Sequence, residues 1–271
     1  MIELRWEWIA LGYFAYLLIV AMIIPRFARA RVGALAGLAV SGLALVVQST
    51  PLSWLGEDSP AFAFVVPLAV LLGGYWLSGL FFVSPMQAIE RQLMAADDRL
   101  LRGTGVLAAY RASPQVVHEF FEMAYVLVYL VIPAGVVTLA MGGHAGAIPR
   151  FWAIVLLAEF VSYGTMPWLQ TRPPRALEST VWSIQSRSDI RRFNAAILDR
   201  GSIGANTVPS GHAAGAVATA LAVVDVMPSA GAVFLLLAAC IVAATVLGRY
   251  HYLVDSLLGV VVAVAAWYLC R

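Results

Sequence analysis

The sequence predicts an all-α membrane protein, a bundle of about eight transmembrane helices. Its 271 residues are 62% hydrophobic and 12% charged, and the mean hydropathy is +0.86. Apolar stretches long enough to cross a bilayer recur along the chain, and short polar segments separate them. These observations exclude an ordinary soluble domain. Cys240 and Cys270 lie far apart in apolar runs, so neither a disulfide framework nor a zinc site is expected.

The N-terminal part, residues 1–84, contains three of the apolar stretches. The first follows a polar head that carries Glu3 and Glu7, and it is long enough to span, so we expect a retained helix and not a cleavable signal peptide. It ends at Pro25, and an arginine-rich turn leads to the second stretch. The expected spans are residues 6–24, 32–47 and 61–83.

Residues 85–117 are expected to connect these helices to the rest of the protein. Between Pro85 and Leu101, apolar and charged residues alternate at helical spacing. This pattern predicts an amphipathic helix on the membrane surface, and the alternative is a soluble connecting helix packed on the spans.

The third part, residues 118–271, contains five further stretches. Pro133 is expected to kink the first of them. Glu159 lies near the middle of the second, and an intramembrane carboxylate is a functional candidate, although it can also be protonated or bonded to a neighbouring helix. The expected spans are residues 118–141, 148–169, 208–226, 231–247 and 252–269.

The stretch from Asn206 to His212, Asn-Thr-Val-Pro-Ser-Gly-His, predicts a helix N-terminus that can bind phosphate. Pro209 suits the first turn of a helix, and Gly211 lets a ligand approach backbone amides. Free N–H groups and the positive end of the helix dipole favour an anion there, and Ser210 adds a hydroxyl. The alternative is an ordinary helix cap with a polar residue behind it.

A second polar pair, His251 and Asp255, would share a helix face because they are four positions apart. Asp255 can accept a hydrogen bond from one imidazole nitrogen, which leaves the other nitrogen as a nucleophile. A capping carboxylate beside a histidine that reaches towards water is the alternative.

Three arginines, Arg172, Arg175 and Arg249, carry guanidinium groups that match phosphate oxygens. Arginines at a membrane edge also pair with lipid headgroups. Counting spans places all three on the same membrane face as His212 and His251. Together these residues predict a cationic phosphate site with a nucleophile and a second histidine for acid catalysis.

These stretches resemble the motifs of the type 2 phosphatidic acid phosphatase superfamily, in the order Arg172-Pro173, Pro209–His212 and Arg249–Asp255. The resemblance covers residues 169–259. The usual first motif has a lysine seven residues before Arg-Pro, where this chain has Thr165. The usual third motif has five residues between arginine and histidine, where this chain has only Tyr250. This close-coupled third motif is similar to the branch near the inositol-phosphotransferase-like members, and the departures leave Arg172 and Arg175 as rival phosphate clamps.

The resemblance implies a six-helix core and a histidine mechanism that needs no metal or other cofactor. His251 would attack phosphorus to form a phosphohistidine, with Asp255 holding its tautomer, and His212 would protonate the leaving oxygen and then activate water. The residues expected to hold the phosphate are Arg172, Arg175, Arg249, Ser210 and Gly211. Apart from the resemblance, Glu122, Tyr125 and Tyr129 follow one stripe of the helix that starts near His118 and are candidates for the pocket lining, with helix packing and boundary aromatics as the alternative. Asn206 and Tyr250 are further pocket candidates.

The favoured function is hydrolysis of a lipid phosphate or diphosphate that reaches the site laterally from the bilayer, such as a polyprenyl phosphate, a polyprenyl diphosphate or phosphatidic acid. One alternative is transfer of phosphate, or of a phospho-headgroup, to an alcohol such as inositol or a sugar. Another is a non-enzymatic binder or transporter of anionic lipids. No nucleic-acid partner is expected, and the sequence does not predict the oligomeric state.

The arginine distribution bears on the side of the membrane, which we expect to be a bacterial inner membrane. All 17 basic residues are arginines, and most of them fall on the face that carries the motifs. The positive-inside rule therefore places that face in the cytoplasm, whereas the resemblance implies a periplasmic site.

Overall fold

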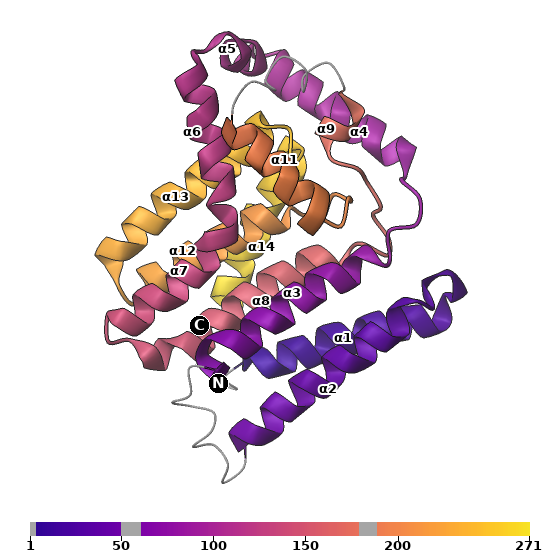
Figure 1. Ribbon diagram of the computed structural model, residues 1–271, viewed down its shortest axis with the longest axis vertical. Coiled ribbons are helices and arrows are strands. Elements are labelled where there is room, and N and C mark those ends of the chain that lie inside the picture. Colours follow the sequence, from indigo (N-terminus) through magenta and orange to yellow (C-terminus); the bar gives the residue numbers. More distant parts are fainter. Residues whose placement is uncertain (1–3, 50–60, 179–188) are drawn as a thin grey trace.

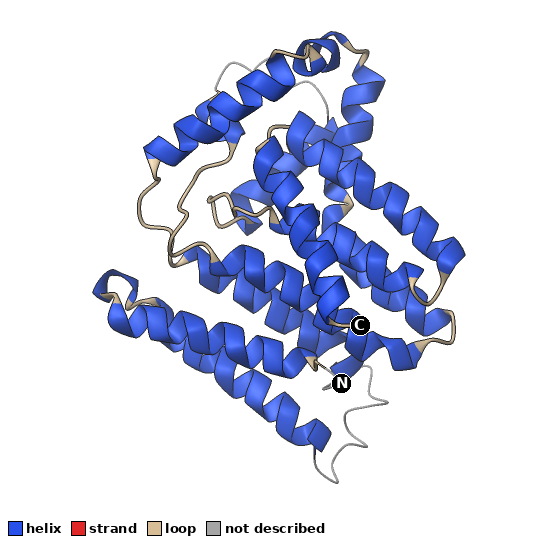
Figure 2. Cartoon of the chain, turned by 180° about the vertical axis from the view of Figure 1, so that it is seen from behind, coloured by secondary structure: helices blue, strands red, loops and turns tan. Residues whose placement is uncertain are grey.

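The computed structural model describes residues 4–49, 61–178 and 189–271, and this part of the chain consists of helices and loops without a β-strand (Figures 1 and 2). The expected all-α class is confirmed. An isolated bridge between Thr171 and Asn206 ties together the loops that precede α9 and α12.

The N-terminal helices form one edge of the bundle. Helices α1 (Trp6–Ile23) and α2 (Ala30–Ser49) are joined through the short η1 (Pro25–Phe27), and α1 also packs against α8. The third helix begins as η3 (Ala61–Val65), continues as α3 (Val66–Gly79) and packs against α8. It ends earlier than the sequence suggests. Figure 1 shows α1 and α2 side by side, next to α3 and α8.

The connector contains α4 (Gln87–Asp97), η4 (Asp98–Arg102) and α5 (Val106–Ala112), and it lies at one end of the bundle (Figure 1). Amphipathic helices normally turn their charged face to water. In α4, by contrast, the carboxylates of Glu90 and Asp97 are buried, while Met86 just before the helix and Leu100 in η4 are exposed. The face of α4 that meets the core is therefore acidic.

The fourth expected span is broken in two, α6 (Gln115–Val126) and α7 (Val128–Met141), which meet at an angle of 56°. The expected kink at Pro133 is wrong, because the bend lies at Leu127. Pro133 sits inside α7, in the second turn of the new helix.

The remaining helices surround α12. They are α8 (Ile148–Gly164), which η5 (Ala145–Ala147) precedes, then α9 (Pro174–Leu177), α11 (Asp189–Gly201), α12 (Gly211–Val224), α13 (Pro228–Leu247) and α14 (Leu253–Leu269). Helix α12 packs against α7, α8, α13 and α14, and its buried side chains are mostly alanine. Small residues let helix backbones approach closely, which explains why α12 can occupy the centre.

The length and the apolar composition of the helices agree with a membrane protein. In the described residues, four are long and apolar enough to cross a bilayer: α1, α2, α13, and α8 together with η5. The bent pair α6–α7 makes a fifth if it counts as one span. Helices α12 and α14, and the third helix from Ala63 to Gly79, are apolar but shorter. The number of eight spans stays a prediction.

Candidate active site

The predicted helix N-terminus is present at Gly211, the first residue of α12. The Ser210 hydroxyl caps the helix by accepting a hydrogen bond from the Ala213 N–H at 3.3 Å, and Thr207 Oγ1 accepts one from the Gly211 N–H at 3.1 Å. Pro209 precedes the capping residue, so its expected place in the first turn is wrong. Ser210 is buried and serves as the cap, whereas Thr207, Gly211 and His212 line the cavity.

The loop between α13 and α14 carries His251, whose Nδ1 lies 3.2 Å from Asp255 Oδ2. A carboxylate only accepts, so Nδ1 carries the proton and Nε2 keeps its lone pair. The Asn206 side-chain amide donates to the same Oδ2 at 2.7 Å, and the Ser210 N–H donates to the Asp255 carbonyl oxygen at 2.9 Å. These bonds join the second and third motifs into one unit.

Burial sets the protonation state of His251. The side chain is 8% exposed, and burial, together with the positive charge of Arg175, lowers the pKa of the imidazole from 6.5 to about 3. Both causes disfavour the charged form. His251 is therefore neutral at physiological pH, as a nucleophile requires.

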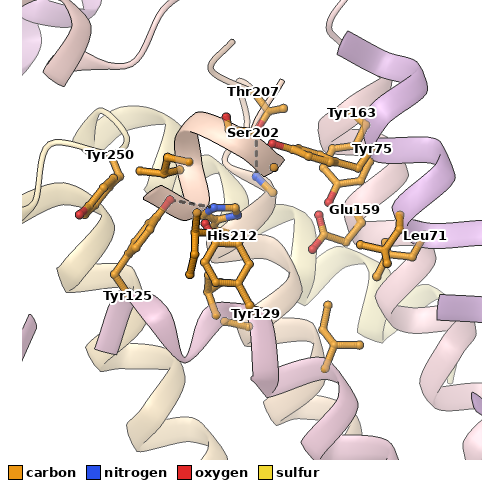
Figure 3. Close-up of a pocket in the computed structure, with 18 of the residues that line it drawn as sticks. Leu71, Tyr75, Tyr125, Tyr129, Glu159, Tyr163, Ser202, Thr207, His212 and Tyr250 are labelled. Atoms are coloured by element: carbon orange, nitrogen blue, oxygen red, sulfur yellow. Dashed lines mark hydrogen bonds between the residues drawn. The ribbon is translucent and has the colours of Figure 1, made fainter. Parts of the chain in front are cut away.

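The second histidine, His212, lies across the site from His251, with 5.4 Å between the ring centroids. Its Nε2 lies 3.1 Å from the Tyr125 hydroxyl (Figure 3). Tyr125 stacks on Tyr250 with 3.6 Å between centroids, and Tyr129 contacts the His212 ring edge-on. The tyrosines hold the imidazole in place from one side.

Arg175 is the arginine that reaches the cavity. Its backbone N–H donates to the Arg249 carbonyl oxygen at 3.0 Å, and its guanidinium carbon lies 5.2 Å from the centroid of the Tyr250 ring. Among residues 4–49, 61–178 and 189–271, no carboxylate forms an ion pair with it. Arg175 therefore presents a positive charge to the cavity beside His251.

Arg172 faces the connector instead. Its Nε and Nη2 bind the two oxygens of Glu90 at 3.0 and 2.8 Å, and its backbone N–H binds the same carboxylate at 2.8 Å. These hydrogen bonds lower the pKa of Glu90.

Arg249 is also turned towards the connector and is 1% exposed. Its Nη1 lies 2.5 Å from Asp97 Oδ2, and its Nη2 lies 2.8 Å from Glu178 Oε1. Asp97 Oδ1 accepts the Leu253 N–H at 2.9 Å and so caps α14. In the described structure neither Arg249 nor Arg172 lines the cavity, and both anchor α4 to the loops that precede α9 and α14.

The cavity that holds both histidines has a volume of about 260 Å³. Its walls are mainly apolar and aromatic, and they come largely from α3, α6, α7, α8, α11 and α12. Figure 3 shows His212, Tyr125 and Tyr250 on one side and Glu159, Tyr163, Tyr75 and Leu71 on the other. A polar reaction centre thus adjoins a large apolar space, the arrangement of many small-molecule sites.

The structure separates the expected pocket residues into two groups. Tyr125, Tyr129 and Tyr250 line the cavity. Asn206 instead supports Asp255, and Glu122 lies behind the wall, where its carboxylate accepts hydrogen bonds from the Tyr250 hydroxyl at 2.6 Å and from Arg191 Nη1 at 2.9 Å.

A family comparison identifies the chain. The model of the PAP2 superfamily matches residues 91–269, two thirds of the sequence. This protein belongs to the PAP2 superfamily. Searches of curated proteins and of solved structures gave no match. Membership indicates a phosphatase-type activity on phosphorylated substrates, and the apolar helices agree with the membrane type of this family.

The PAP2 match begins within α4 and includes every residue of the candidate site except those of α3 and Glu90. The wall residues of α3 and α11, such as Tyr75, Trp76 and Leu198, could not be predicted as part of the site from the sequence. Apolar and aromatic side chains in such helices do not by themselves indicate a binding site. In the described ranges, no group of three or more His, Cys, Asp or Glu side chains could hold a metal ion.

Proposed function

We propose that this protein is an integral membrane phosphatase that hydrolyses a lipid phosphate or diphosphate through a phosphohistidine intermediate. The observation that carries the proposal is the buried pair of His251 and Asp255, placed with His212 and Arg175 on one cavity whose other walls are apolar. A nucleophile, its orienting carboxylate, a second proton-transfer group and a cation thus share one space.

In the first step, His251 Nε2 attacks phosphorus, and a P–N bond forms as the P–O bond to the lipid alcohol breaks. Asp255 stabilises the imidazolium that develops, because it holds the Nδ1 proton. The leaving oxygen takes a proton from the His212–Tyr125 pair, whose 3.1 Å hydrogen bond lets the hydroxyl relay it.

In the second step, His212 accepts a proton from water as the water oxygen attacks phosphorus and the P–N bond breaks. Free phosphate and neutral His251 are regenerated. In both transition states, the negative charge on the phosphoryl oxygens is stabilised by Arg175 and by the N-terminus of α12 at Gly211.

The apolar walls suit a lipid chain. Leu68 and Leu72 of α3 and Val128 and Ile132 of α7 line the cavity. A prenyl or acyl chain that reaches the site laterally from the bilayer would lie between these walls, while its phosphate sits at His251. Burial of the chain provides affinity without charge, and the histidines and Arg175 provide the chemistry.

A phosphate-release assay with purified protein in detergent tests the proposal. The substrates are undecaprenyl phosphate, undecaprenyl diphosphate, phosphatidic acid and sphingosine 1-phosphate, each with and without glycerol or inositol as acceptor. We expect release of inorganic phosphate from at least one lipid without an acceptor, and its loss in His251→Ala. Product formed only when the acceptor is present would indicate a transferase. Lipid binding without any product would indicate a binder or transporter.

We further propose that the site faces the cytoplasm of a bacterial inner membrane, because most arginines lie on the motif face. Arg192 is exposed on α11 and provides a position for labelling. After replacement of Cys240 and Cys270 by alanine, Arg192→Cys should resist a membrane-impermeant maleimide in right-side-out vesicles and react in inverted ones. The opposite pattern would place the site in the periplasm.

A further inference from the structure

A carboxylate that the reaction scheme above does not use lies in the wall of the same cavity. Glu159 comes from the middle of α8, is 4% exposed and lines the cavity. In Figure 3 its side chain points into the cavity, on the side opposite Tyr125. A carboxylate within an apolar helix is costly, so its retention calls for a function or a partner.

The Glu159 carboxyl group packs on the first turn of α12. A Cβ atom added at Gly211 would lie 2.8 Å from Glu159 Oε2, and one added at Gly215 would be closer still to Oε1. Any other residue at these two positions would displace the carboxyl group. The glycines therefore make room for Glu159 directly beside the turn that carries His212.

The hydrogen bonds of this region are incomplete. In the described residues, Glu159 Oε2 is buried and makes no hydrogen bond of normal geometry, although the Tyr163 hydroxyl lies near enough to interact with the carboxyl group. Thr207 lines the same cavity, and its hydroxyl oxygen accepts a hydrogen bond from the N–H of Gly211, the residue over which Glu159 lies. In the described part of the chain, the Thr207 hydroxyl has no acceptor for its proton. Burying a polar atom without a partner costs about 1–3 kcal/mol, which a ligand with a matching group would recover.

We propose that Glu159 and Thr207 form a subsite for a hydroxyl group next to the phosphate of the substrate. This inference rests on the proposed function, because it names the class of lipid phosphate: one with a free hydroxyl near the phosphoester. A hydroxyl donates to an ionised carboxylate and accepts from a protonated one, so it pairs with Glu159 in either state. The substrate hydroxyl can also accept a hydrogen bond from the Thr207 hydroxyl, and it brings no charge into a mostly apolar cavity.

The test compares two lipid phosphates that differ in one group. Lysophosphatidic acid has a free hydroxyl beside the phosphoester, and its 2-deoxy analogue has hydrogen at that position. Specificity, the ratio of the two kcat/KM values for phosphate release, is measured for the wild type, Glu159→Leu and Glu159→Gln. Because both values come from the same preparation, partial unfolding of a variant cancels. Glu119→Gln, on the outer side of α6, is the matched control.

We expect the wild type and Glu119→Gln to favour the hydroxyl substrate by about tenfold, the effect of one lost hydrogen bond to a buried group. Glu159→Leu should reduce the ratio to about one, and Glu159→Gln, which keeps an acceptor oxygen, should lie between them.

Two results would overturn the inference while the proposed function stands: equal hydrolysis of both lipids by the wild type, or a preference that survives in Glu159→Leu. A 2-amino-2-deoxy analogue that is preferred over lysophosphatidic acid only when Glu159 is present would also overturn it, in favour of an ammonium subsite. If the wild type releases phosphate from none of the lipids tested, the proposed function fails, and the inference fails with it.

Discussion

Arg249 and Asp97, 152 positions apart in the sequence, form a buried ion pair with 2.5 Å between Nη1 and Oδ2. The same carboxylate caps α14 through the Leu253 N–H. The arginine of the third motif thus holds the connector against the loop that carries His251, and Arg175 is the arginine left facing the cavity.

Arg249→Ala is expected to lower stability more than substrate affinity. The variant leaves Asp97 and Glu178 buried without their cation, and breaking a buried pair costs about 3–5 kcal/mol. Thermal unfolding in detergent should show a lower midpoint than for the wild type, with KM changed little in the protein that stays folded. A higher KM at unchanged stability would show that Arg249 binds phosphate after all.

Arg175→Ala should behave in the opposite way. Removing the cavity-facing guanidinium takes away stabilisation of the phosphoryl oxygens, so kcat/KM should fall about 10²- to 10³-fold. Stability should be nearly unchanged, since no described carboxylate depends on Arg175. Arg172→Ala, which unpairs Glu90 at the connector, is the matched control. An equal loss of kcat/KM in both variants would argue against a distinct role for Arg175.

Tyr125→Phe tests the proton relay. The substitution removes the hydroxyl next to His212 Nε2 and keeps the ring that stacks on Tyr250. We expect kcat to fall about tenfold, since a proton-transfer group is removed, with KM nearly unchanged. The loss should be smaller for an aryl phosphate, because its leaving oxygen needs no proton. The same loss for both substrates would contradict the relay.

The pH dependence of stability follows from the pKa of His251. Burial first, and the charge of Arg175 second, lower this pKa from 6.5 to about 3. Between pH 6.5 and pH 3 the unfolded chain binds a proton that the folded protein does not. Stability should therefore fall as the pH drops through this window, with no contribution from His251 above it. The unfolding midpoint of His251→Gln should depend less on pH across the window, and an unchanged dependence would contradict the assignment.

The helical class, and the proximity of His251 to Asp255, could be predicted from the sequence because both depend on local patterns. Apolar runs and their proline and arginine boundaries mark the helices. The spacing of His251 and Asp255 brings their side chains together even though His251 lies just before α14 and not within it. The tyrosines at positions 125 and 129 were expected at the pocket from their shared stripe on one helix.

The roles of the arginines could not be predicted in the same way. Arg172, Arg175 and Arg249 look alike in sequence, and their partners Glu90 and Asp97 lie about 80 and 150 positions away. These carboxylates belong to an amphipathic pattern that normally faces water. Only the packing of α4 on the loops before α9 and α14 shows which arginine faces the cavity. The bend at Leu127 likewise lies six residues before Pro133, the residue at which the sequence predicts it.

Detection of the phosphoenzyme tests the central claim most directly. His212→Ala, incubated with a ³²P-labelled aryl phosphate, should still undergo the first step, because the aryl leaving group needs no acid, and should accumulate label for lack of a base. The phosphohistidine mechanism predicts an acid-labile, alkali-stable label on His251, and no label in the His251→Ala, His212→Ala double variant. Turnover of lipid phosphate by His251→Ala at the wild-type rate, or label on another residue, would contradict it.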